Sequence, residues 1–106
     1  ILGAPVVLAV VFRPKTPVRE AERVYDLNCL ASVWCCIENL LLSLAEDDVF
    51  GVTFIPKNTP GVKEALGIPA ELEVAALIPI GYRGDGYREM PQKEIDIHSR
   101  IHRERW

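Results

Sequence analysis

The chain has 106 residues, of which 49% are hydrophobic and 25% charged, and its formal net charge is −3. This length allows one domain at most, and the composition is that of an ordinary globular protein. The acidic balance and the lack of a basic stripe argue against a nucleic-acid-binding scaffold, so we expect no nucleic acid partner.

The first predicted element is a strand over residues 6–12. Its sequence, VVLAVVF, is a continuous valine-rich apolar run, which is typical of a strand covered on both faces. Pro5 and Pro14 bound it, because proline cannot donate to a strand ladder. The apolar run 1–12 is too short to span a bilayer and no basic region precedes it, so we expect no membrane association.

A long helix is predicted over residues 26–46. Its apolar positions repeat with alternating spacings of three and four on one helical face: Leu27, Leu30, Trp34, Ile37, Leu41 and Leu44. Val33, Cys36 and Leu40 widen the apolar surface, so the helix must be covered on most sides. A homodimer through helix 26–46 is the favoured source of that cover. The alternative is a central helix wrapped by its own domain.

The three cysteines, Cys29, Cys35 and Cys36, all lie in this helical segment. Adjacent Cys35 and Cys36 point in different directions on a helix, so we expect no disulfide between them. An odd number of thiols among Leu, Trp and Ile indicates reduced, buried cysteines in an intracellular protein. We therefore expect a cytoplasmic location.

A short strand is predicted over residues 51–55, and a short helix follows it. Asn58 or Thr59 is the expected N-cap, because both side chains can accept a hydrogen bond from the first helical turn. Pro60 suits the first helical position, and Gly67 suits the position just after the helix.

A second buried strand is predicted over residues 72–82, where Pro79 indicates an edge position or a bulge. Beyond this strand the sequence becomes mostly charged and is punctuated by Gly and Pro. We therefore expect a single domain over residues 1–106, with a core at 1–82 and a C-terminal arm at 83–106.

Two local patterns in the arm are partly similar to known motifs, one to a metal site and one to a phosphate loop. His98 and His102 share a helical spacing but have no third ligand nearby, so solvated histidines are favoured over a metal site. The Gly84-Asp85-Gly86 run lacks the other residues of a phosphate loop and predicts a turn. The arginines that flank this turn, Arg83 and Arg88, are candidates for binding a phosphate.

Several segments, taken in order, resemble the C-terminal half of the FMN-dependent nitroreductase family. They are residues 4–7 (APVV), 37–42 (IENLLL), 62–69 (VKEALGIP), 76–82 (ALIPIGY) and 88–92 (REMPQ), and the charged end closing on Trp106 is also similar. The resemblance covers most of the chain, and the order and spacing of the segments make it more specific than any one of them.

The resemblance implies an α+β, nitroreductase-like fold, with a central dimer-forming helix against a small mixed sheet and an extended C-terminal tail. It also implies an obligate homodimer with FMN at its interface. Electrons would pass from NAD(P)H through FMN to nitro compounds, quinones or similar small-molecule acceptors. A cofactor that carries the difficult chemistry explains why no catalytic acid, base or nucleophile stands out.

The resemblance also assigns candidate site residues. Thr53, Phe54, Ile55 and Pro56 match the segment that passes the flavin ring, where backbone N–H groups address the cofactor and Pro56 has none to give. Arg88 matches the arginine that contacts the FMN phosphate, and Arg83 is a weaker candidate.

The chain departs from the family pattern at three places. Residues 48–51 (DVFG) replace a glycine-rich turn, Gly86 stands where a lysine is common, and the N-terminal flavin-binding segment has no counterpart. FMN affinity should fall without that segment. The alternatives are a non-catalytic dimerisation or binding module, or association with a separate polypeptide that supplies the missing half. The chain opens on Ile1 rather than Met, so we expect processing or an upstream part.

Overall fold

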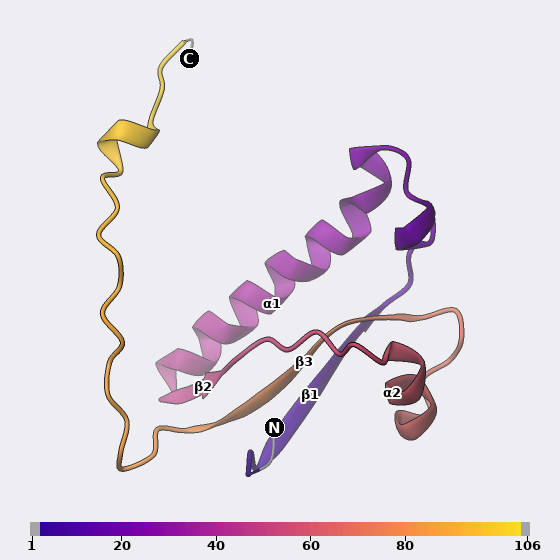
Figure 1. Ribbon diagram of the computed structural model, residues 1–106, viewed down its shortest axis with the longest axis horizontal. Coiled ribbons are helices and arrows are strands. Elements are labelled where there is room, and N and C mark those ends of the chain that lie inside the picture. Colours follow the sequence, from indigo (N-terminus) through magenta and orange to yellow (C-terminus); the bar gives the residue numbers. More distant parts are fainter. Residues whose placement is uncertain (1–2, 105–106) are drawn as a thin grey trace.

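The computed structural model describes residues 3–104, which form an α+β fold (Figure 1). The strands and α-helices, in chain order, are β1 (Val6–Phe12), α1 (Asn28–Glu46), β2 (Val49–Gly51), α2 (Thr59–Leu66) and β3 (Glu73–Tyr82). Three short 3-10 helices complete the described elements: η1 (Val18–Glu20), η2 (Val24–Leu27) and η3 (His98–Arg100). After β3 the chain runs away from the body as an extended arm, drawn in orange to yellow.

The described strands form one three-stranded sheet with the order β1-β3-β2. Both pairings are antiparallel, so the sheet is antiparallel over these residues where we expected mixed pairing. The register of β2 on β3 continues beyond Gly51, because Phe54 forms an isolated antiparallel bridge with Leu77. The predicted strand at 51–55 is therefore present as β2 followed by a single bridge.

Pro79 lies in the central strand, so the prediction of an edge position or a bulge at this residue was wrong. The register of β1 on β3 shifts between Val10 and Val11, away from Pro79. Pro79 still accepts a hydrogen bond through its carbonyl oxygen, from the N–H of Val52 at 3.4 Å. Its missing N–H removes a single ladder bond just beyond the end of β2, which is why a central strand tolerates it.

Helix α1 packs its apolar seam against one face of the sheet. Ile37 of α1 is buried with Ala75, Ala76 and Ile78 of β3, and Trp34 and Leu41 of the predicted seam pack against this cluster. Gly51 allows the close approach, because a Cβ atom there would lie 2.9 Å from Ile80 Cγ2 and 3.2 Å from Leu41 Cδ2. The predicted seam is thus the face that α1 presents to the sheet.

Two expectations about burial were wrong for the described residues. Strand β1 is covered on one face only, and Val7 and Val11 on its other face are 40% and 37% exposed. Cys35 and Cys36 are free thiols that are exposed rather than buried. Both results have the same cause. The single helix α1 covers only one face of the sheet, and nothing among the described residues covers the side of α1 that faces away from the sheet.

Helix α2 has the termini that its sequence predicts. The Asn58 side chain accepts a hydrogen bond from the Gly61 N–H at 3.1 Å, which caps the first turn. At the other end Gly67 adopts the left-handed φ of 64° that favours glycine. Lys63 Nζ donates to the Ala70 carbonyl at 2.7 Å, which holds the loop that leads into β3.

One helical segment of the described chain, Val24–Glu46, is long and apolar enough to cross a membrane by length and composition. The core helix of a water-soluble protein passes the same test. Ile37 and its neighbours pack on the sheet, which accounts for the apolar face that α1 turns toward the sheet. Only 6% of the apolar window is buried within the described residues, so its outward face is not explained in this way.

Candidate functional site

The segment after β2 runs along the open edge of the sheet with alternate backbone groups bonded to β3. The Phe54 N–H donates to the Leu77 carbonyl at 2.8 Å, and the Phe54 carbonyl accepts from the Leu77 N–H at the same distance. In an antiparallel ladder the residues on either side then direct their N–H groups away from the partner strand. Within residues 3–104, the Thr53 and Ile55 N–H groups have no hydrogen-bond partner.

This pattern sharpens the assignment of the four candidate residues in the segment. The Phe54 N–H is already used by the bridge to Leu77, so it is not available to a ligand. Pro56 has no N–H and is buried. The two remaining candidates, Thr53 and Ile55, supply the backbone donors at this edge.

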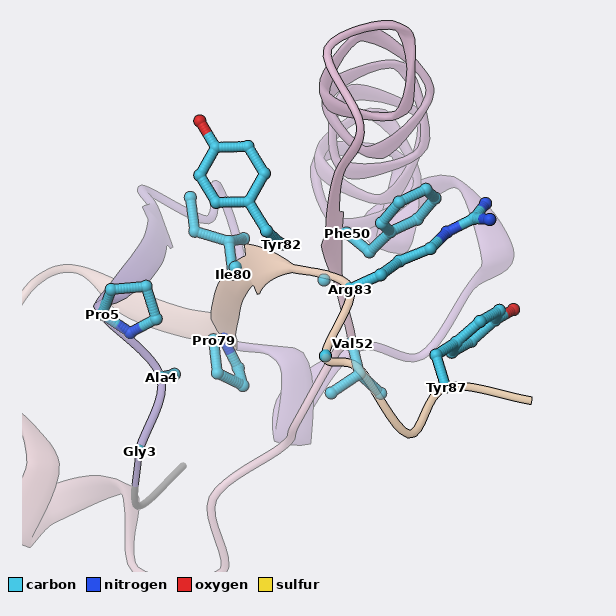
Figure 2. A pocket seen from close by; sticks show the side chains of 13 residues that line it. Gly3, Ala4, Pro5, Phe50, Val52, Pro79, Ile80, Tyr82, Arg83 and Tyr87 are labelled. Atoms are coloured by element: carbon cyan, nitrogen blue, oxygen red, sulfur yellow. The ribbon is translucent and has the colours of Figure 1, made fainter. Parts of the chain in front are cut away.

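A cleft of about 540 Å³ opens beside this edge, at the end of β3 (Figure 2). Its lining comes from the residues just before β1, from the end of β2 and the residue after it, and from the residues that close β3, including Pro5, Val52, Pro79 and Ile80. Arg83 is the charged residue in the described lining, and no carboxylate faces it there. The cleft is therefore mostly apolar with one cation at its rim, which suits a ligand with an apolar body and an anionic group.

Arg83 is held between two aromatic rings. Its guanidinium carbon lies 4.3 Å from the centre of the Phe50 ring and 4.9 Å from the centre of the Tyr87 ring, as Figure 2 shows. The Tyr87 N–H donates to the Gly84 carbonyl at 2.9 Å, which forms the turn predicted at Gly84-Asp85-Gly86. The turn and the two cation–π contacts together fix the start of the arm against β2.

The structure brings only part of the predicted site into this cleft. Arg83 lines it, whereas Thr53, Phe54, Ile55, Pro56 and Arg88 are outside the lining. Arg88 is exposed in the arm and forms no ion pair within residues 3–104. Sequence reasoning missed Phe50, Tyr87 and Val52, because no local pattern links an aromatic residue in a short strand to an arginine 33 positions later.

The ion pairs of the described residues lie at a distance from this cleft in the fold. Arg13 contacts Glu71 at 3.3 Å on the exposed side of the loop before β3. Arg23 contacts Asp26 at 2.9 Å in η2, and the hydrogen bond from the Arg23 side chain holds the pKa of Asp26 below its usual value. Across the described residues, no group of three or more His, Cys, Asp or Glu side chains is placed to hold a metal ion.

The Thr53 and Ile55 N–H groups at this edge fit the ring of a planar cofactor such as FMN, whereas Arg88, the candidate for its phosphate, lies apart in the arm. Unpaired backbone N–H groups are donors that a heteroaromatic ring can satisfy, and they are costly to leave without a partner when covered. Arg88 has no competing carboxylate, so its guanidinium is available for an anion. The site offers donors and positive charge rather than an acid–base pair.

No family model matches the chain. A curated relative, an iodotyrosine deiodinase from Thermotoga neapolitana, is 31% identical over 66 residues, which cover 62% of this chain and 36% of that protein. The chain thus spans little more than a third of the length of this relative.

Solved structures match over a larger part of the chain. An oxidized iodotyrosine deiodinase bound to FMN and 3-iodo-L-tyrosine superposes with a TM-score of 0.71 and 26% identity, over 97% of this chain and 48% of that one. A nitroreductase-like family protein from Bacillus cereus gives 0.68 and 14% identity, over 91% of this chain and 49% of that one. The chain has a nitroreductase-like fold and spans about half of the structures that share it.

Proposed function

We propose that the chain is part of an FMN-dependent oxidoreductase that transfers electrons from NAD(P)H to small acceptors such as nitro compounds or quinones. The observation that carries this proposal is the pair of unpaired N–H groups of Thr53 and Ile55, on the edge where the family resemblance places the flavin ring. The FMN in the matched deiodinase supports it.

Bound FMN would supply the hydride chemistry, and the chain would supply binding and orientation. Thr53 and Ile55 would donate backbone hydrogen bonds to the ring, while Phe54 keeps the segment in register through its bridge to Leu77. Arg88 would contact the phosphate as a charge-assisted donor. Arg83, stacked between two rings, would add positive charge at the rim of the cleft.

We also propose that a second copy of the chain covers the outward face of α1. This face is exposed and carries almost no charge: the helix has no Lys, Arg or Asp, and its only acidic residues are Glu38 and Glu46. A solvated helix face is normally rich in charges, whereas the centre of a subunit interface is depleted of them. A homodimer through α1 therefore accounts for this face better than water or a bilayer does, and it agrees with a cytoplasmic protein.

Leu42 lies on this outward face and is 60% exposed within the single chain. In Leu42→Glu a buried, unpaired carboxylate would oppose assembly, so sedimentation should show a dimer for the native protein and a monomer for the variant. Val24→Glu is the control, because Val24 is 84% exposed and precedes the helix. A native protein that sediments as a monomer at micromolar concentration would refute the dimer.

Reductive deiodination of 3-iodo-L-tyrosine is the second candidate reaction. The curated relative and the FMN-bound structure with 26% identity are both iodotyrosine deiodinases, the latter containing 3-iodo-L-tyrosine. The same flavin chemistry serves both reactions, because in each the reduced flavin delivers two electrons to a small acceptor. The acceptor that reoxidises the flavin fastest separates the two candidates.

The experiment is the visible absorption spectrum of the purified protein, before and after addition of FMN and then of NADH or NADPH. The proposal predicts flavin bands that bleach with the nicotinamide and return with a nitroarene, a quinone or 3-iodo-L-tyrosine. A colourless dimer that takes up no FMN would reject the proposal and favour a non-catalytic dimerisation or binding module.

A further inference from the structure

The sheet has a second apolar face, opposite α1, most of which is exposed or half-buried in the described residues. We name it the outer face and define it by the side chains that alternate with those of the core: Val7, Ala9, Val11, Val52, Phe54, Leu77 and Pro79. Its neighbours on the other side of β1, Leu8, Val10 and Phe12, pack toward the core.

Strand register arranges these side chains in two rows across the sheet. Val7 pairs with Pro79, whose carbonyl accepts from Val52, and Ala9 pairs with Leu77, which bridges to Phe54. Cross-strand partners on one face lie in contact distance of one another. The outer face is therefore one continuous surface, and none of its members is charged or polar.

Much of this surface faces water in the described chain. Val52 is 63% exposed and Phe54 is 44% exposed, in addition to the exposed valines of β1. Each square ångström of apolar surface removed from water contributes roughly 25 cal/mol, so covering this face is strongly favourable. Continuous exposed apolar patches mark interaction surfaces rather than ordinary solvated surface.

The matched structures indicate what covers this face. They contain about as much polypeptide again as this chain, and nearly all of the chain is used in the match. A sheet that is apolar on both faces must be enclosed between layers, and α1 supplies only one. We infer that the outer face is the docking surface of the polypeptide that completes a nitroreductase-like domain.

The composition of the two open surfaces favours this occupant over a second copy of the chain. The outer face consists of valine, phenylalanine, leucine, proline and alanine, which is the composition of a domain core. The outward face of α1 mixes small, amide and hydroxyl side chains with Leu42, which is the composition of a subunit interface. A second copy therefore belongs on α1, and a permanent covering layer belongs on the sheet.

Site-specific photocrosslinking in the cells that naturally express the protein tests this inference. A benzophenone amino acid replaces Val52 or Phe54, and Lys57 is the matched control because it is exposed in the next loop and outside the outer face. Mass spectrometry then identifies the crosslinked peptide. The inference predicts that positions 52 and 54, and not 57, crosslink to a segment with nitroreductase-like sequence that the 106 residues do not contain.

Three results would overturn the inference. They are crosslinks from positions 52 and 54 to a second copy of the chain, crosslinks to lipid, or yields no higher than at position 57. The inference rests on the fold and not on flavin binding, so the flavin content of the same preparations is measured separately. A crosslinked but flavin-free complex would retain the docking surface and refute the proposed oxidoreductase.

Discussion

The two faces of the sheet come from the same three strands and have similar apolar composition, yet they have different surroundings. On the inner face Ile78 is fully buried against α1, whereas on the outer face Val52 is mostly exposed. Alternation along a strand decides which face a residue joins, and the available layers decide whether that face is covered. Apolar composition therefore predicts that a sheet face is buried in the functional protein, and it does not predict that residues of the same chain bury it.

The largest contrast between the faces should come from removing side-chain volume. Ile37→Ala opens a cavity where α1 meets the sheet, so the free energy of unfolding should fall by about 2–5 kcal/mol. Val52→Ala on the outer face should change it by no more than about 0.5 kcal/mol in the isolated chain. Urea denaturation measures both values, and equal losses would show that the outer face is already covered.

A smaller effect is expected from adding volume at the inner face. Gly51→Ala places a methyl group against Ile80 and Leu41, so α1 must move away from the sheet at a cost of about 1–3 kcal/mol. Gly84→Ala is the matched control, because a Cβ atom there meets nothing within 4 Å. Thermal unfolding compares the two variants, and an unchanged midpoint for Gly51→Ala would contradict the close packing of α1.

The smallest effect is expected from a fall in pH. The residue whose pKa is shifted, Asp26, lies in η2, so the two faces of the sheet should not respond. The Arg23 side chain lowers the pKa of Asp26 below 3.8, so this pair stabilises the fold above that pH. The contribution is lost as the pH falls through the lowered pKa of the folded state. Between pH 5 and pH 3, urea denaturation should show a smaller loss of unfolding free energy for Asp26→Asn than for the native protein. Equal losses would mean that the Arg23–Asp26 ion pair does not contribute to stability.

The sequence predicted most of the local structure because local signals specify it. The Asn58 cap, the Gly67 stop and the α1 seam all depend on residues close together in the chain, and each is present. The prediction of an edge position or a bulge at Pro79 was wrong. A central strand tolerates proline where the neighbouring strand ends, and the sequence near Pro79 does not show where β2 ends against β3. The burial of Cys35 and Cys36 was wrong because periodicity reports apolar character and not the number of covering layers.

The candidate site was less predictable than the fold. The resemblance indicated the segment at 53–56, but only the bridge between Phe54 and Leu77 distinguishes the donors that are free from the one that is used. The stacking of Arg83 between Phe50 and Tyr87 joins three parts of the chain, and no spacing rule anticipates it. Whether Arg88 contacts a phosphate remains a prediction.

An FMN titration of the purified protein, followed by flavin fluorescence, tests the central claim most directly. The account predicts saturable binding that Arg88→Ala weakens about tenfold to a hundredfold, the value of one charge-assisted hydrogen bond. Arg100→Ala, an arginine in η3 of the same arm, should bind FMN as the native protein does. A native protein with no saturable FMN binding, or an Arg88→Ala variant that binds equally well, would contradict the account.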